Sequence, residues 1–354
     1  MDKILTHSVI ADEGVSCTPI YQNKYHKNNI TKTTTVSDIT SWTTGTSLPG
    51  ALAYSQAIVT KNRVYLLSGY NGSAWVATVY TAPINTDGTI GTWTTGTSLP
   101  GALALSQAIV TKNRVYLLGG YTGSAVSTVY TAPINTDGTL GTWTTGTSLP
   151  GVLRGSQAIV TKNRVYLLGG VTTVRVSTVY TAPINVDGTL GAWTTGTSLP
   201  GALAESQAII TKSRVYLLGG YDGTSYLATV RTAPINTDGT IGAWTTGTSL
   251  PGVLGSSQAI LTKGRVFLLG GYTAGAVSTV YTAPINTDGT LGAWTTGTSL
   301  SSVLQISQAI VTKDRVYLLG GNSNTAPVDT VYTASFADGW EILENSYLVC
   351  EENL

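Results

Sequence analysis

The sequence predicts an all-β protein in which copies of one antiparallel unit close into a ring, and three observations support this. The phrase Trp-Thr-Thr-Gly-Thr-Ser-Leu recurs with a period of 50 or 51 residues, which indicates one supersecondary unit stacked on its copies. Only 10% of the residues are charged and 41 are glycine, which favours short strands and tight turns over helical repeats. Each copy also contains the phrase Ser-Gln-Ala. The first phrase begins at Trp42, Trp93, Trp143, Trp193, Trp244 and Trp294.

One copy, residues 106–150, is expected to form a four-stranded meander. Lys-Asn, Gly-Gly and Asn-Thr-Asp-Gly segments separate its apolar runs, and these residue types are typical of turns. The unbroken run Val-Tyr-Leu-Leu indicates a strand covered on both faces, as between blades packed around an axis. The four expected strands cover 106–111, 114–118, 128–132 and a segment that begins at 140.

The repeat resembles the kelch repeat of β-propellers. The resemblance rests on an apolar strand that ends in Gly119-Gly120, then Tyr130 and then Trp143, and it covers about residues 42–335. The first copy has Ser68 in place of the first glycine. The 13 residues from Tyr to Trp exceed the spacing of a typical kelch unit, so a longer third turn is expected. Kelch propellers include enzymes and binding modules, so the resemblance implies a fold and no activity.

The number of blades follows from the two ends of the array. The last copy departs from the pattern after its third strand, while the strand at Trp42 has no complete blade before it. We therefore expect a six-bladed kelch-like β-propeller, closed by the N-terminal Trp42 strand, which removes the exposed sheet edge. The alternative is seven blades, with residues 8–42 as a degenerate first blade. The expected divisions are an N-terminal extension at 1–38, the propeller at 39–335 and an acidic C-terminal tail at 336–354.

The copies differ mainly in two segments that a meander places on one face of the disc, before Ser-Gln-Ala and after Gly-Gly. The turns expected on the other face hardly vary. Aromatic and arginine side chains are enriched where proteins bind partners, so the variable face is predicted to bind a ligand. Two alternatives are simple loop drift and, for the tyrosines, packing on the next blade. The candidate residues are Tyr54, Tyr70, Trp75, Tyr121, Arg154, Arg175, Glu205, Tyr221, Tyr226, Arg231 and Tyr272.

Few residues suited to catalysis occur in the repeats, so neither catalytic residues, a metal nor a cofactor is expected. The only histidines are His7 and His26, and no cysteine lies between Cys17 and Cys350, which excludes the copper site of kelch-type oxidases. Glu205 is the only glutamate in the array, so paired-carboxylate glycoside hydrolysis is disfavoured. The Asn-Thr-Asp-Gly segments are expected to be turns held by their own side chains, not calcium loops. Each such aspartate is predicted to lie near the Lys or Arg of its own blade.

These observations favour a non-catalytic binding or structural propeller. Near-identical copies and short unrelated tails resemble bacteriophage virion proteins, such as tail or host-attachment components, which implies a surface glycan or protein receptor. The tails would then dock to other virion proteins. The alternatives are a cytoplasmic kelch scaffold for protein partners and, less favoured, a carbohydrate-active hydrolase. From its first residues and apolar runs we expect neither a signal peptide nor a membrane span, and its weak positive charge argues against nucleic acid. Whether Cys17 and Cys350 form a disulfide stays open.

Overall fold

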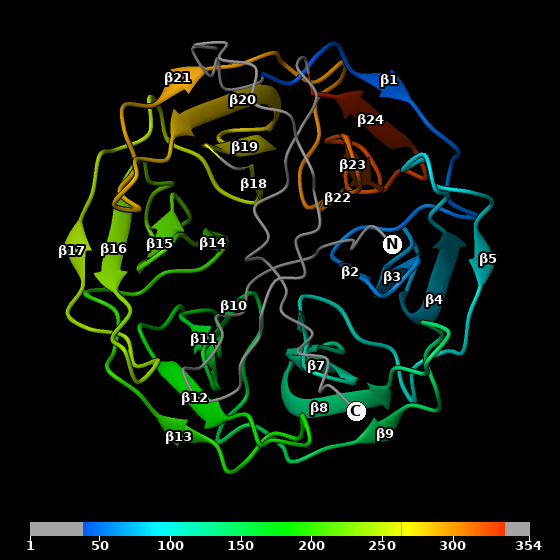
Figure 1. The fold of residues 1–354 in the computed structure, drawn as a ribbon, viewed down its shortest axis with the longest axis horizontal. Helices are drawn as coiled ribbons and strands as arrows, with labels where there is room; N and C mark the ends of the chain where they lie inside the picture. Colours follow the sequence, from blue (N-terminus) through cyan, green and yellow to red (C-terminus); the bar gives the residue numbers. More distant parts are fainter. Residues whose placement is uncertain (1–37, 263, 337–354) are drawn as a thin grey trace, which may run out of the picture.

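The computed structural model describes residues 38–262 and 264–336, which form six four-stranded antiparallel blades around one axis (Figure 1). The predicted all-β propeller is therefore confirmed. Along these residues the structure has no helix that could cross a membrane. The expectations for the two terminal segments, including the Cys17–Cys350 question, fall outside the described residues.

In blades one to five the strands follow one another outward from the axis in chain order (Figure 1). Blade one holds β2 (Gln56–Val59), β3 (Arg63–Tyr70), β4 (Trp75–Pro83) and β5 (Thr94–Thr95). Blade two holds β6 (Gln107–Val110), β7 (Arg114–Tyr121), β8 (Ala125–Pro133) and β9 (Thr144–Thr145). Blade three holds β10 (Gln157–Thr161), β11 (Arg164–Leu168), β12 (Val179–Pro183) and β13 (Thr194–Thr195).

Blade four holds β14 (Gln207–Ile210), β15 (Arg214–Leu218), β16 (Val230–Pro234) and β17 (Thr245–Thr246). Blade five holds β18 (Gln258–Leu261), β19 (Arg265–Tyr272), β20 (Ala276–Pro284) and β21 (Thr295–Thr296). Blade six holds β22 (Gln308–Val311), β23 (Arg315–Leu319) and β24 (Val331–Ser335), and its fourth strand is β1 (Thr43–Thr44) from the other end of the chain.

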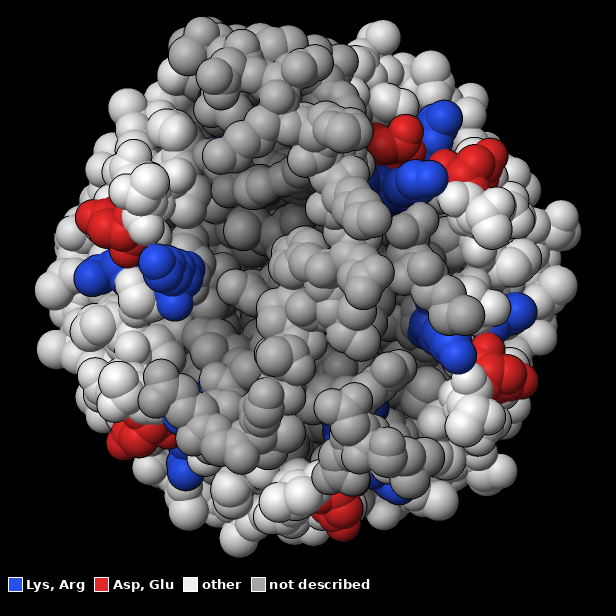
Figure 2. All heavy atoms as spheres, viewed as in Figure 1, with Lys and Arg blue, Asp and Glu red and all other residues white. Residues whose placement is uncertain are grey.

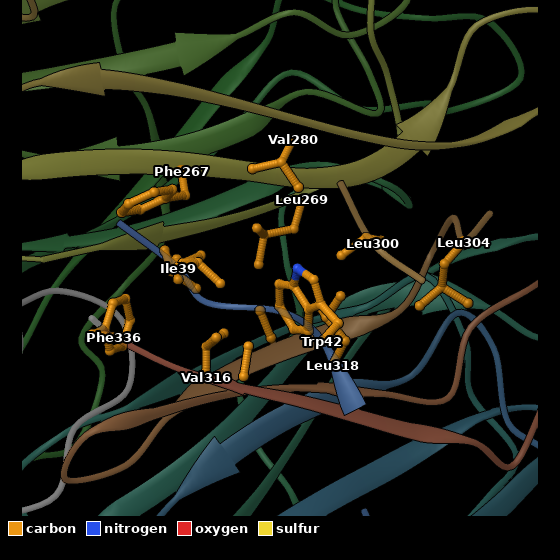
Figure 3. Close-up of a cluster of buried hydrophobic side chains, with 13 residues drawn as sticks. Ile39, Trp42, Phe267, Leu269, Val280, Leu300, Leu304, Val316, Leu318 and Phe336 are labelled. Atoms are coloured by element: carbon orange, nitrogen blue, oxygen red, sulfur yellow. The ribbon is translucent and has the colours of Figure 1, made fainter. Parts of the chain in front are cut away.

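The ring closes where β1 pairs with β24. Thr43 lies opposite Thr333, and the Thr40 amide donates a 2.8 Å hydrogen bond to the Ser335 carbonyl. Trp42 is buried among apolar side chains of blades five and six, including Leu300 and Leu318 (Figure 3). Six blades with a shared last blade are thus confirmed, and the seven-blade alternative is wrong because the Trp42 strand already completes the sixth sheet.

The Gly-Gly pair is required where neighbouring blades approach each other. Gly119 has a φ of 61°, and a Cβ atom there would lie 2.4 Å from the Leu153 carbonyl oxygen. The adjacent Gly120 amide donates to that same oxygen, at 2.7 Å. The pair therefore bends the strand and bonds it to the next blade at once, which a residue with a side chain does only under strain.

The uniform turns also bond blade to blade. Thr60 Oγ1 and the Tyr65 hydroxyl of blade one both donate to the Gly138 carbonyl of blade two, at 2.7 and 3.2 Å. The third turn of each such blade therefore lies over the first turn of the preceding blade. Hydrogen bonds from the Thr139 hydroxyl and amide are the main cause of the lowered pKa of Asp137, and the charge of Arg63 lowers it slightly further. The arginine near this aspartate is therefore Arg63 of the preceding blade and not Arg114 of its own, so the same-blade prediction is wrong. Figure 2, which views this face, shows Lys and Arg beside Asp in separate groups around the rim.

The contact between blades five and six lacks the hydrogen bond from a tyrosine hydroxyl to a turn carbonyl, and the sequence differs there accordingly. The sixth blade takes its fourth strand from the N-terminal part of the chain, so it has no Asn-x-Asp-Gly turn. In blade five the tyrosine that would donate to that turn is replaced by Phe267, which is fully buried. Its ring packs against Phe336, with centroids 6.4 Å apart, and Ile39 lies beside both (Figure 3). Phenylalanine therefore occupies the position at which a tyrosine hydroxyl would have no turn carbonyl as acceptor.

Candidate ligand-binding mouth of the central channel

The variable segments of all six blades meet around one end of the central channel. They surround a cavity of about 570 Å³, within the size range of small-molecule sites. Of the predicted residues, seven line this cavity: Tyr54, Trp75, Tyr121, Arg154, Glu205, Tyr226 and Tyr272. The prediction that two separate variable segments share one face thus agrees with the geometry, and we call this region the channel mouth.

The residue just before Ser-Gln-Ala has a left-handed backbone in every blade. The φ values lie between 52° and 58°, a region that side chains other than glycine adopt at a cost. Only blade three has glycine there, whereas blade six has the β-branched Ile306. All six residues line the cavity, and we call them the mouth ring: Tyr54, Leu105, Gly155, Glu205, Ser256 and Ile306.

One side of the mouth is an aromatic group around Trp75, the first residue of β4. Its ring centroid lies 4.7 Å from that of Tyr70, 5.2 Å from Tyr121 and 6.1 Å from Tyr54. The Arg154 guanidinium lies 5.0 Å from the Tyr121 ring centroid, a cation–π distance. We call these five residues the Trp75 cluster. The expected alternative, that the tyrosines pack on the neighbouring blade, holds as well, because Trp75 of blade one contacts Tyr121 of blade two.

The other side of the mouth is organised by Glu205, whose carboxylate is fully engaged. One oxygen lies 3.5 Å from an Arg175 guanidinium nitrogen, and the other accepts hydrogen bonds from the Tyr226 hydroxyl and Ser256 Oγ at 3.3 and 3.2 Å. Burial and then the charge of Glu205 raise the pKa of Tyr226, so this hydroxyl stays a proton donor. Arg175 also lies 4.2 Å over the ring of Tyr221. With Tyr272, which packs on Tyr226 at 5.2 Å, these residues form the Glu205 cluster.

The two clusters face each other across the channel, and they influence each other electrostatically. Tyr54 belongs to blade one and Glu205 to blade four, on the opposite side of the ring. Burial raises the pKa of Tyr54, and the charge of Glu205 raises it further, against a smaller lowering by Arg154. The Tyr54 hydroxyl is therefore neutral at ordinary pH. A ligand in the mouth would meet aromatic faces on two sides.

Arg231 does not belong to the channel mouth, in contrast to the prediction. It lies within β16 and pairs with Leu217 of β15 and Thr246 of β17. Its side chain donates a 3.1 Å hydrogen bond to the Gly201 carbonyl. Tyrosines such as Tyr130 hold this position in other blades and reach the corresponding Leu-Pro-Gly segment. Arginine can replace tyrosine at this position because its long side chain also carries a terminal donor that reaches the Leu-Pro-Gly segment.

Sequence reasoning missed the polar residues deeper in the cavity. The glutamine of each Ser-Gln-Ala phrase donates through Nε2 to the serine carbonyl before it, at 2.9–3.2 Å. Its Oε1 accepts from a backbone amide of the next blade at 3.1–3.3 Å, and the last bond returns to blade one. We call these side chains the glutamine ring: Gln56, Gln107, Gln157, Gln207, Gln258 and Gln308. The available signal was an unchanging polar residue in the innermost strand.

Across residues 38–262 and 264–336, no group of His, Cys, Asp and Glu side chains is arranged to hold a metal ion. The Asn-Thr-Asp-Gly turns are held internally, as predicted. In blade two, Asp137 Oδ1 accepts from the Thr139 amide at 2.9 Å and from its hydroxyl at 2.7 Å. The described residues of the mouth offer aromatic contact and hydrogen bonding.

Comparisons with known proteins extend to the fold. The sequence matches no protein-family model. It also matches no curated protein. Among solved structures 561 chains match, so the fold is widely shared. One of them, described as "Structure of YjhT", superimposes with a TM-score of 0.67 over 80% of this chain and 95% of that chain, at 12% sequence identity. Identity this low shows a common fold alone, so the chain is similar to YjhT as a β-propeller and its function rests on its own residues.

Proposed function

We propose that the protein is a non-catalytic binding propeller that holds a host-surface glycan or protein at the channel mouth. The observation that carries the proposal is the contrast between the two faces. Side chains with large contact area and directional donors gather at the mouth, while the turns on the opposite face repeat almost unchanged. The face that carries the channel mouth is therefore suited to binding a ligand.

The state of Glu205 supports a non-catalytic role. Both of its oxygens are occupied by donors, and Arg175 offsets its charge, so it is a poor general base or nucleophile. Among the described residues that line the cavity, Glu205 is the only carboxylate. Paired-carboxylate hydrolysis needs two acidic groups at a defined separation, and the mouth offers one engaged group.

The proposal extends to the setting of the protein. The Gly-Gly pair, present in five copies, the tyrosine, replaced by Arg231 in one copy, and the tryptophan support a kelch-type propeller. The near-identical copies support a bacteriophage virion component. A cytoplasmic kelch scaffold would use the same mouth for a peptide. Co-purification of the protein with virion proteins from a lysate of infected cells supports the first setting, and its recovery with cytoplasmic partners alone supports the second.

Binding of the purified full-length protein to a panel of glycans and bacterial surfaces tests the function. Trp75→Ala and Tyr226→Ala, one from each cluster, are expected to weaken binding by about tenfold or more, since buried aromatic anchors at interfaces contribute about 2 kcal/mol or more. Val186→Thr is the matched control, because Val186 is 89% exposed on the opposite face and threonine stands there in other copies.

Three outcomes contradict the proposal. Equal binding by the cluster variants and the control would place the ligand elsewhere. Absence of binding to every glycan and surface would remove the receptor function. Release of shorter products from a bound glycan would show that the protein is an enzyme.

A further inference from the structure

The mouth is enclosed on every side by the ring of blades, and this limits how a ligand reaches the cavity. Residues of all six blades line it. The glutamine ring joins each innermost strand to the next by a hydrogen bond without interruption. Backbone bonds also join the mouth ring, as from the Gly155 amide to the Leu105 carbonyl at 2.8 Å. A ligand can therefore reach the glutamine ring from the mouth only by moving along the axis.

The lining deeper in the cavity has unused hydrogen-bonding capacity. A glutamine amide has two N–H donors and two main acceptor positions, and the bonds described above use one of each. Each member of the glutamine ring therefore keeps one donor and one acceptor in a side chain whose position is already fixed. The buried hydroxyls of Ser55 and Ser106 have no hydrogen-bond partner among the described residues, and both residues line the cavity.

This combination fits a hydroxyl-rich ring. Fixed amide groups deep in the cavity can exchange hydrogen bonds with hydroxyls, and the Trp75 and Glu205 clusters present aromatic faces to the apolar side of such a ring. A peptide amino terminus fits less well, because Glu205 is already engaged by Arg175. Building on the proposed receptor function, we infer that the mouth takes the terminal sugar residue of a glycan, inserted end-on along the channel axis, and not an internal segment.

Gly155 offers a way to close the cavity without altering either cluster. It belongs to the mouth ring, and a Cβ placed on it meets no atom within 4 Å. Blade one carries Tyr54 and blade five Ser256 at the same position and backbone conformation, so both side chains are compatible with the fold. Gly155→Tyr is expected to fill the entrance and reduce glycan binding by about tenfold or more. Gly155→Ser, with a smaller side chain, should reduce binding less, and Val186→Thr on the opposite face should bind as the wild type does. Gly155→Leu, the residue of blade two, serves as a second blocking variant if the tyrosine variant does not fold.

The test uses an array of oligosaccharides in pairs that differ only by one added residue on the recognised end. End-on insertion predicts that the added residue abolishes binding and that enzymatic removal of the recognised terminal residue does the same. Equal binding to both members of a pair, or to internal segments with blocked ends, would overturn the inference while leaving the receptor function in place. Binding to none of the glycans would instead contradict a glycan receptor altogether.

A peptide array with free and amidated C-termini separates the remaining possibility. Arg154 lines the mouth and could face a terminal carboxylate. Binding to free C-termini alone, lost in Gly155→Tyr, would overturn the sugar inference and show that the same mouth takes peptide ends.

Discussion

Ser68 occupies, in blade one, the left-handed position that glycine holds in the other five blades, and we expect Ser68→Gly to stabilise the protein. Its φ is 51°, it is fully buried, and its hydroxyl has no hydrogen-bond partner within residues 38–262 and 264–336. Ser68 thus combines two unfavourable features at one site. Ser68→Gly removes both the side chain at a left-handed position and the buried hydroxyl. It leaves unchanged the neighbouring Gly69, whose amide donates to the Leu103 carbonyl of the next blade at 2.9 Å.

The expected gain follows from three contributions. A non-glycine residue in the left-handed region costs about 1 kcal/mol or more. A buried hydroxyl without a partner costs about 1 kcal/mol at the lower end of its range. Glycine gives back about 0.5–1 kcal/mol through the greater entropy of the unfolded chain. The net expectation is that the free energy of unfolding rises by about 1 kcal/mol, and by more if the hydroxyl is costlier.

Urea unfolding followed by tryptophan fluorescence measures this change, and Ser68→Ala separates its parts. The alanine variant removes the hydroxyl but keeps the Cβ atom, so it should gain only the hydroxyl contribution. The reverse exchange, Gly119→Ser in blade two, should lower the midpoint. Because the entropy cost of glycine offsets most of the backbone gain, the two variants should have similar stability. If Ser68→Gly is less stable than Ser68→Ala by the full entropy cost of about 0.5–1 kcal/mol, the backbone contribution is absent. If it is less stable than the wild type, the whole argument is refuted.

Three further predictions concern the contact between blades five and six, the acid stability and the mouth ring. Phe267→Tyr should lower the urea midpoint, because the added hydroxyl has no turn carbonyl to donate to. Tyr116→Phe should lower the free energy of unfolding by about 1 kcal/mol, because it removes the hydrogen bond to the Gly188 carbonyl. A Phe267→Tyr protein with an unchanged midpoint would contradict this account. Hydrogen bonds from the Ser225 and Thr224 amides and then the Thr224 hydroxyl lower the pKa of Asp222 to about 2 from 3.8, so its stabilisation is complete above pH 4 and is lost as the pH falls toward 2. Asp222→Asn should therefore flatten acid unfolding in that window, and a carboxyl signal titrating near pH 4 by NMR would disprove the shift. Ile306→Gly should raise the urea midpoint by relieving a β-branched left-handed residue, and a lower midpoint would show that its contacts outweigh the strain.

The sequence was sufficient for the architecture because six copies fix the phase of every strand. Once the Trp42 strand is aligned with Trp93, the last copy lacks a fourth strand and the first has one to spare, so closure follows. The pairing of turns could not be obtained this way. Asp137 meets Arg63 of the preceding blade because the third turn of one blade lies over the first turn of its neighbour, and that offset is a property of packing, not of the order of residues.

The site was predictable to the extent that it varies. Variation located seven of the residues that line the cavity, but it also drew in Arg231, whose variation reflects a contact on the blade itself. The glutamine ring was missed because its residues do not vary. An unchanging residue in a repeat is read as a requirement of the fold, and each of these glutamines does join two blades. Only the structure shows that the same side chains also face the cavity with hydrogen-bonding capacity to spare.

The mouth ring bears on whether variation at the mouth is simple drift. Two of the positions with positive φ are present in all six blades with φ between 51° and 61°, and the copies treat them differently. At the Gly119 position, five of six blades have glycine, as expected where a Cβ atom would also strike a carbonyl. At the mouth ring, where a Cβ atom has room, one blade has glycine and five carry side chains that bear the backbone cost. Drift limited only by folding would favour glycine or asparagine at such a position. Tyrosine, leucine, glutamate and isoleucine there, all directed at one cavity, are better explained by what they contact in it than by tolerance of change.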